Sequence, residues 1–120
     1  MLSVSAQGRV FFATQPVDMR KGFNGLVGVV RAVLDEDPLS GDVFCFLNRR
    51  RNLMKVLCFN GDGYVIFYKR LEKGLFQNPV TDGIKGTILP AQLAMLLAGI
   101  DIHTAKRRAR YQRPPPRTSV

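Results

Sequence analysis

The chain has 120 residues, of which 46% are apolar and 22% charged, a balance that excludes a disordered chain and two ordinary domains. Its net charge is +9, and six of these charges follow Ile102, where no acidic residue stands. The first 102 residues carry only about +3, so an argument for a polyanionic partner depends on local clusters of basic residues.

The N-terminal third predicts a strand followed by a helix. Residues 9–13 are rich in valine and phenylalanine, which suit a pleated surface, and Pro16 ends the run. Asp18 is a good N-cap residue, and apolar residues then recur at three- and four-residue spacing up to Leu34. We therefore expect a helix over residues 19–34. Its solvent-facing basic side should carry Arg20, Asn24 and Arg31.

Three strands are predicted after the turn residues at positions 35–41, where Pro38 ends the helix. They are rich in branched and aromatic residues and span residues 43–47, 53–59 and 64–71. The last two are separated by Asn60-Gly61-Asp62-Gly63. This is the strongest hairpin signal in the chain, because Asn-Gly and Asp-Gly supply the positive φ that tight turns require.

The C-terminal part predicts a loop, a helix and a tail. Residues 72–85 have no sustained period, so we expect a loop that wraps the domain and could include a short strand. A second helix should run from Pro90 to the stop signal at Gly99. The sequence therefore predicts an α+β fold of strand, helix, three-stranded antiparallel meander and helix over residues 1–102. A basic, proline-rich tail without fixed structure should follow over residues 103–120.

The hairpin signal also fixes which residues share a sheet face. For any two-residue turn within residues 60–63, one face of the hairpin carries alternate residues of both strands. These are Leu53, Lys55, Leu57 and Phe59 of the first strand and Tyr64, Ile66, Tyr68 and Arg70 of the second. At the end of this face nearest Arg49-Arg50-Arg51, the phenol of Tyr68 then lies among the cations of Lys55 and Arg70. Such a mixture suits phosphate contact and base stacking. The alternative is a solvated loop tip that blunts a sheet edge, beside a core or a dimer interface.

Both faces of the two long strands are apolar at their middle, because Val56, Cys58, Val65 and Phe67 occupy the second face. One face should be covered by a helix and the other by something else. A second protomer is the simplest candidate, so the sequence also suggests a homo-oligomer.

The tail gives the most explicit signal for a polyanionic partner. Its six cations would release counterions on meeting a phosphate backbone, without preference for a base sequence. The foremost candidates are Lys106, Arg107, Arg108 and Arg110. A solvated tail, and one that binds an acidic patch on a protein, are the alternatives that the residues leave open.

Catalysis, metals and membranes find little support in the sequence. The nine carboxylates are spread over a cap, loops and a turn, and no nucleophile stands beside a histidine. Cys45 and Cys58 lie in apolar runs far from His103, so we expect no zinc site and no cofactor. No apolar run approaches the roughly 20 residues that span a bilayer. We expect a cytoplasmic protein that is not an enzyme.

Four runs carry a resemblance to a known family: VDMRKGFNGL at 17–26, NRRRNLMKVL at 48–57, GDGYVIFYKRLEKGLF at 61–76 and LLAGID at 96–101. Together they closely resemble the TnpB-type accessory protein of insertion sequence family sixty-six, in the expected order over roughly residues 9–102. The resemblance implies a small accessory product, encoded beside a second small protein and a larger transposase that carries the catalytic triad. Asn24 and Asn60 depart from positions where the family commonly has an acidic residue, which argues against an essential carboxylate there.

The residues and the resemblance together predict a non-catalytic protein that supports transposition by binding DNA, with the element ends as a guess at the target. The predicted phosphate contacts are Arg49, Arg50, Arg51, Lys55, Lys69 and Arg70, with Tyr68 as a stacking or positioning group. Arg20 and Lys21 would form a secondary patch. The alternative is an adaptor that docks on the transposase and meets acidic protein instead of DNA. A metal-dependent nuclease acting alone is a third reading, which predicts plasmid nicking.

Overall fold

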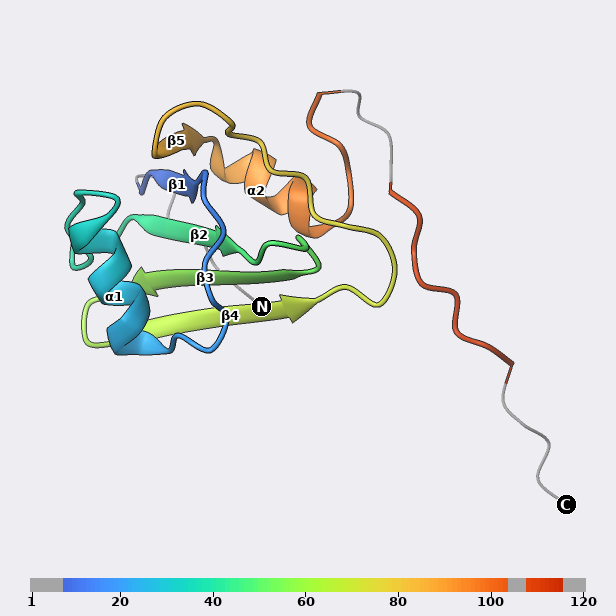
Figure 1. Cartoon of the computed structure of the whole chain (residues 1–120), viewed down its shortest axis with the longest axis horizontal. Coiled ribbons are helices and arrows are strands. Elements are labelled where there is room, and N and C mark those ends of the chain that lie inside the picture. Colours follow the sequence, from blue (N-terminus) through green and yellow to red (C-terminus); the bar gives the residue numbers. More distant parts are fainter. Residues whose placement is uncertain (1–7, 104–107, 116–120) are drawn as a thin grey trace, which may run out of the picture.

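The computed structural model describes residues 8–103 and 108–115, which form a five-stranded mixed sheet with two helices. In chain order the elements are β1 (Val10–Ala13), α1 (Phe23–Ala32), β2 (Val43–Leu47), β3 (Leu53–Phe59), β4 (Tyr64–Arg70), β5 (Lys85–Ile88) and α2 (Pro90–Leu97). The strand order is β4-β3-β2-β1-β5, with β4 and β5 at the edges (Figure 1). Strands β1 and β2 are parallel, and the other neighbours are antiparallel. The predicted α+β class is confirmed.

The hairpin of β3 and β4 has the register that its turn residues predict. Tyr68 lies opposite Lys55, and Arg70 lies opposite Leu53. In the turn, the N–H of Asn60 donates to the carbonyl of Gly63 at 3.0 Å, and Gly61 adopts a φ of 104°. Asn-Gly was therefore a sound guide to which side chains share a face.

Two cores form because the strand side chains alternate between the two faces of the sheet. The core under α1 includes Phe11, Phe44, Phe46 and Leu57 from the strands, with Leu26 and Val30 from the helix. The core under α2 includes Phe12, Cys45, Met54 and Val56 from the strands, with Phe76, Leu93 and Leu96. The second face is thus covered by a helix of the same chain. The sequence suggested a second protomer for this face; α2 takes much of that place, and the homo-oligomer stays a prediction.

Helix α1 begins at Phe23 and not at residue 19, with Gly22 as an N-cap that offers no side-chain hydrogen bond. Asp18 does not cap the helix: its carboxylate accepts hydrogen bonds from the backbone N–H and the guanidinium of Arg20. Arg20 therefore lies outside α1, and the predicted basic helix face with Asn24 and Arg31 does not form. The helix ends as expected, with Asp35 in the left-handed region at a φ of 53°.

The segment between β4 and α2 contributes more to the fold than its sequence indicates. Phe76 is fully buried in the α2-side core. Residues 85–88 form edge strand β5 on β1, at the end of the loop for which the sequence allowed a short strand without placing it. Val80 packs over Gly86, where an added Cβ would meet the Cγ1 of Val80 at 2.5 Å. The predicted second helix is confirmed as α2, and Gly99 follows it with a φ of 83°.

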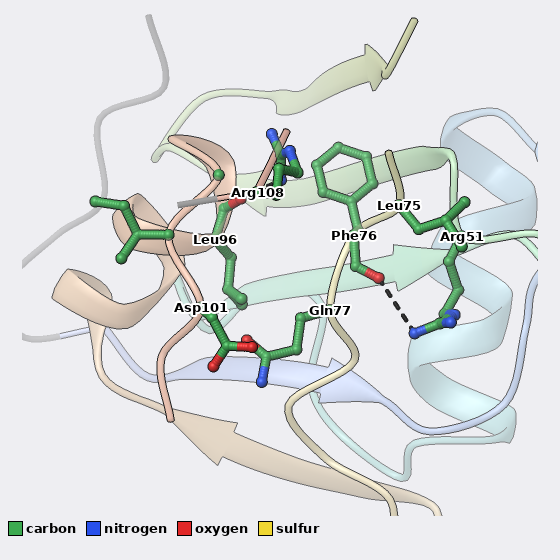
Figure 2. A pocket seen from close by; sticks show the side chains of 9 residues that line it. Arg51, Leu75, Phe76, Gln77, Leu96, Asp101 and Arg108 are labelled. Carbon is green, nitrogen blue, oxygen red and sulfur yellow. Dashed lines mark hydrogen bonds between the residues drawn. The ribbon is translucent and has the colours of Figure 1, made fainter. Parts of the chain in front are cut away.

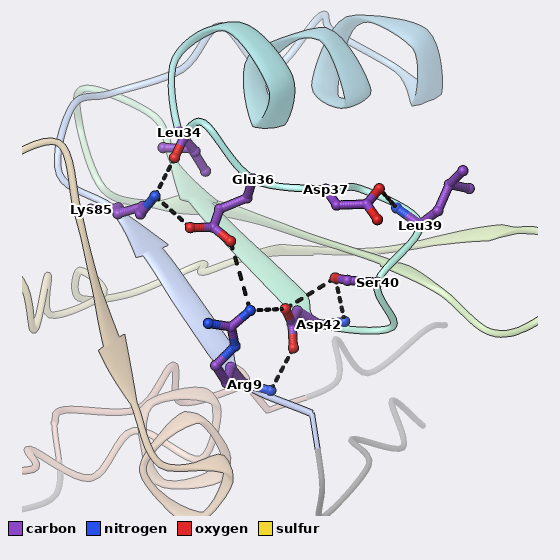
Figure 3. Close-up of polar contacts among 8 residues, drawn as sticks. All are labelled: Arg9, Leu34, Glu36, Asp37, Leu39, Ser40, Asp42 and Lys85. Atoms are coloured by element: carbon purple, nitrogen blue, oxygen red, sulfur yellow. Dashed lines mark hydrogen bonds and ion pairs between the residues drawn. The ribbon is translucent and has the colours of Figure 1, made fainter.

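A polar network joins the start of β1 to the segment after α1 (Figure 3). The backbone N–H and guanidinium of Arg9 donate to the two carboxylate oxygens of Asp42 at 2.9 and 3.0 Å. Ser40 donates to the same carboxylate at 3.0 Å, and Glu36 pairs with Lys85 of β5. Burial alone would raise the pKa of Asp42, but the hydrogen bonds from Arg9 and Ser40 outweigh it and lower the pKa.

We expect Asp42→Asn to destabilise the domain by about 1–2 kcal/mol at pH 7, because it weakens charge-assisted hydrogen bonds at a buried site. The folded-state pKa of Asp42 lies below the unfolded value of about 3.9, so its stabilisation is present above that pH and is lost as the pH falls through the folded pKa. Urea unfolding at pH 7 and at about pH 3 should therefore show a smaller gap between the two proteins in acid. An equal gap at both pH values would contradict this assignment.

Candidate nucleic-acid interface

In the loop between β2 and β3, the third of three consecutive arginines makes contacts that the first two lack. Arg49 and Arg50 are exposed at the loop tip. Arg51 has a φ of 64°, and its carbonyl accepts a hydrogen bond from the N–H of Phe76 at 2.7 Å. Its guanidinium also donates to the carbonyl of Phe76, at 3.4 Å (Figure 2). Arg51 is therefore attached to the loop that enters the α2-side core, although it also lines a small groove together with Arg49.

A groove of about 490 Å³ lies between the tip of this loop and the segment that leads to α1. One wall contains Asp18 and Met19, and the other contains Arg49 and Arg50. The first segment is fixed to the sheet by the N–H of Val17, which donates to the carbonyl of Leu47 at 2.9 Å. The structure thus brings the loop arginines beside the segment that carries Arg20 and Lys21, two sites that the sequence treats separately.

Lys55 is placed in the interior and not on the predicted phosphate-binding surface. It is only 8% exposed, and its ammonium donates to the carbonyls of Met19 and Lys21 at 2.7 and 2.8 Å. The same ammonium lies 4.6 Å from the ring centre of Tyr68. A charged group with these partners fixes the approach to α1 and has little surface left for a phosphate, so we do not include Lys55 in the surface proposed below.

Tyr68 and Arg70 lie on the α1 side of edge strand β4, as the hairpin register predicts. Tyr68 is 51% exposed, with Lys55 against its ring. The guanidinium of Arg70 donates to Glu72 at 2.8 Å, a hydrogen bond that raises the pKa of Arg70. Tyr68 is therefore open to a ligand, whereas the charge of Arg70 is partly compensated.

The remaining cations of this surface differ in how far acidic groups neutralise them. Arg20 forms a two-point contact with Asp18, whose pKa its hydrogen bonds lower to about 2. Lys21, Arg49 and Arg50 are exposed and form no ion pair with any residue that the structure describes. These three cations are the ones free to meet an external anion. We call them the α1-side basic surface.

A second group of cations gathers where α2 ends, on the opposite side of β4. The ammonium of Lys69 donates to the carbonyl of Leu97 at 3.0 Å, and the guanidinium of Arg108 donates to that of Leu96 at 3.0 Å. Arg108 also lies 5.2 Å from the ring centre of Phe76. Cations at a helix C-terminus satisfy its free carbonyls and its dipole, so both residues help to fix α2. Lys106 and Arg107 fall outside the described residues.

Sequence reasoning missed two residues near this second group, Lys73 and Tyr111. Together with Arg110 they line a groove between β4 and the C-terminal segment. Gly74, with a φ of 79°, turns the chain there and passes close to Arg108 and Ala109. The signal for Tyr111 was present in the sequence, since it is an aromatic residue among closely spaced arginines.

The structure offers little that suggests redox or metal chemistry. Both cysteines are free and buried, and burial raises the pKa of the Cys45 thiol far above its usual range. Across residues 8–103 and 108–115, no three side chains of histidine, cysteine, aspartate or glutamate gather as metal ligands would. Neither of the two helices described is long and apolar enough to cross a membrane.

Comparison with known proteins gives one family and two relatives. The family model described as IS66 Orf2 like protein matches residues 8–107. A Sinorhizobium fredii protein titled "Uncharacterized protein y4hO" is 44% identical over 101 residues, covering 84% of this chain and 88% of its own length. Another from that bacterium, "Uncharacterized protein y4jC", is 38% identical over 109 residues, covering 90% and 92%. No solved structure matches the chain.

Proposed function

Since the chain belongs to the family of IS66 Orf2-like proteins, which are insertion-sequence accessory proteins, we propose that it supports transposition by binding DNA beside a separate transposase. The matched residues include all four runs on which the sequence resemblance rests, and the resemblance is thereby confirmed. The family consists of accessory proteins and not of known catalysts. In this proposal the transposase performs the chemistry, and this chain supplies a DNA-binding surface.

The observation that carries the proposal is the α1-side basic surface. Arg49 and Arg50 project from a loop tip and line one wall of an open groove. Lys21 lines the adjoining groove beside α1, and Asp18 lines both grooves. Because none of the three forms an ion pair with a described residue, these cations can replace the counterions of a phosphate backbone. Tyr68, half exposed on the same side of the sheet, would position the backbone or stack on a base. The ends of the element are the proposed target.

An adaptor function is the second candidate, because the structure also has an apolar groove on its surface. This groove of about 260 Å³ lies between α1 and the segment before β5, with Val29, Val33 and Ile84 in its lining. Val33 and Ile84 are 49% and 58% exposed, which is high for branched apolar side chains beside a groove. Such a site would suit an apolar segment of the transposase, with the basic residues facing acidic protein.

We expect the double variant Arg49→Ala/Arg50→Ala to bind DNA at least about tenfold more weakly and to flatten the salt dependence. The slope of log affinity against log salt should fall by about 2, since two phosphate contacts are lost. Fluorescence anisotropy on an element-end duplex and a scrambled duplex, over a salt series, measures both quantities. Both arginines are exposed, so the stability of the variant should match that of the unchanged protein.

Arg31→Ala is the matched control, because Arg31 is an exposed arginine of α1 outside the groove. It should reduce affinity by less than about threefold, as a distant surface charge acts mainly through net charge. Equal losses in both variants would reject a defined DNA-binding surface. If duplex DNA binds weakly and the affinity for the transposase changes little with salt concentration, the adaptor function is favoured instead.

A further inference from the structure

The groove between β4 and the C-terminal segment is a second concentration of positive charge, separate from the α1-side basic surface. It has a volume of about 280 Å³. Its lining includes five cations and one carboxylate: Lys69, Arg70, Lys73, Arg108, Arg110 and Glu72. The carboxylate is already paired, since Glu72 accepts hydrogen bonds from Arg70 at 2.8 and 3.2 Å. The concave lining therefore carries a large uncompensated positive charge.

The cations of this groove are held near one another despite their mutual repulsion. Partial burial lowers the pKa of Lys69, and the charges of Arg108 and Arg110 lower it further. Partial burial and Arg110 also lower the pKa of Arg108. An anion in the groove would relieve this repulsion, and a phosphate is the anion that clustered lysines and arginines most often bind.

Fixing the end of α2 accounts for only part of this arrangement. Lys69 and Arg108 each donate to a terminal carbonyl of α2, but an ammonium has three N–H donors and that contact uses one. Lys73 and Arg110 are exposed and form no ion pair with a residue in the described part of the chain. No hydrogen bond or ion pair within the described residues explains why Lys73 and Arg110 lie on the rim of the groove. Their position suits contact with a ligand.

The shape of the groove favours a single strand over a duplex. Two of its cations are partly buried between a strand edge and an extended segment, where a flexible backbone can descend. Duplex DNA has a persistence length of about 150 base pairs, so it does not bend into a small groove, and its bases are already paired and stacked. A duplex would therefore contact mainly the cations on the rim. Tyr111 lines the same groove and is 55% exposed, which provides a ring on which an unpaired base can stack.

We propose that the groove between β4 and residues 108–111 binds the phosphate backbone of single-stranded DNA, with Tyr111 stacking on a base. This inference rests on the proposed DNA-binding function and extends it, since it assigns a different DNA form to a different surface. The α1-side basic surface would meet duplex DNA, while this groove would take a strand that has been separated from its complement.

The test compares a labelled oligothymidine of about 12 nucleotides with a duplex of equal length, by fluorescence anisotropy of the full-length protein. Lys73→Ala/Arg110→Ala changes only the rim cations and leaves the two that fix α2. It should weaken oligothymidine binding by about tenfold or more while duplex affinity changes less than about threefold. Tyr111→Ala should weaken oligothymidine binding by about tenfold, and Tyr111→Phe should retain it.

Arg113→Ala is the matched control, because it removes an exposed arginine of the same segment that does not line the groove. It should change oligothymidine affinity by less than about threefold. Equal losses in this control and in Lys73→Ala/Arg110→Ala, or equal losses on both DNA forms, would overturn the inference. If the protein binds duplex DNA but not oligothymidine, the single-strand inference fails and the proposed function stands. If the protein binds oligothymidine independently of Arg49 and Arg50 and does not bind duplex DNA, only the duplex proposal fails.

Discussion

Phe76→Ala should destabilise the domain by about 3–5 kcal/mol, the typical cost of removing a buried ring and leaving a cavity. Phe76 has no exposed surface and is the fully buried residue of the 71–84 loop in the α2-side core, where it lies with Leu93 and Leu96. Arg108 also packs on its ring. The midpoint of urea unfolding, followed by circular dichroism, should fall sharply, and the C-terminal segment should lose its contact with the domain.

Leu75→Ala provides the control for this prediction. Leu75 is the preceding residue and is 44% exposed, so its truncation should change the free energy of unfolding by less than about 1 kcal/mol. If both variants lose the same stability, the loop is held by its backbone and not by the buried ring. If Phe76→Ala matches the unchanged protein, the ring is not part of the core that the structure shows.

Lys55→Met should destabilise the domain by about 2–5 kcal/mol, although lysine is usually a surface residue. The substitution keeps a long side chain but leaves the carbonyls of Met19 and Lys21 without their donor, at about 1–3 kcal/mol for each unsatisfied group. The start of α1 should become mobile, and amide hydrogen exchange near Gly22 should accelerate. Urea unfolding measures the loss of stability.

Lys21→Met separates the structural role of Lys55 from a role in DNA binding. Lys21 is exposed, and it contributes only its backbone carbonyl to the contact with Lys55. This variant should keep the stability of the unchanged protein and lose affinity for duplex DNA. A stable Lys55→Met protein with impaired DNA binding would show instead that Lys55 contacts phosphate, as its sequence position suggests.

The β3–β4 hairpin could be predicted from sequence because its information is local. Gly61 of Asn-Gly provides the positive φ of the turn, and side-chain alternation then determines that Tyr68 faces Lys55. The second helix could also be predicted, from Pro90 at its start and Gly99 after its end, because the effects of these residues on the backbone are intrinsic to them. In each case the relevant partners lie within a few residues of one another.

The start of α1 could not be predicted because its determinants are distant in sequence. Asp18 has the chemistry of an N-cap, but Arg20 occupies its carboxylate. The carbonyls of Met19 and Lys21 turn toward Lys55, more than thirty residues later, which prevents them from entering a helix. A local rule identifies a suitable cap and cannot identify the tertiary partner that competes with it.

Strand β5 and the division of the arginines were missed for a related reason. Residues 85–88 combine a lysine and a glycine with only two β-branched residues, a run too short to predict a strand alone, and they form one on the edge that β1 offers. Arg51 looks like its two neighbours in the sequence, and only its left-handed backbone and its contacts with Phe76 separate it from them. A run of charges predicts where cations occur but not which of them a distant loop will hold in place.

The position of β1 has a consequence for how the chain folds as it is synthesised. Its neighbours in the sheet are β2 and β5, so Val10 pairs with Ile88, near the other end of the domain. A nascent chain cannot complete the sheet, or cover Phe12 with α2, until residues 85–97 have left the ribosome. A product that terminates before β5 would expose one edge of β1 and an open apolar face, and would be prone to aggregation and proteolysis.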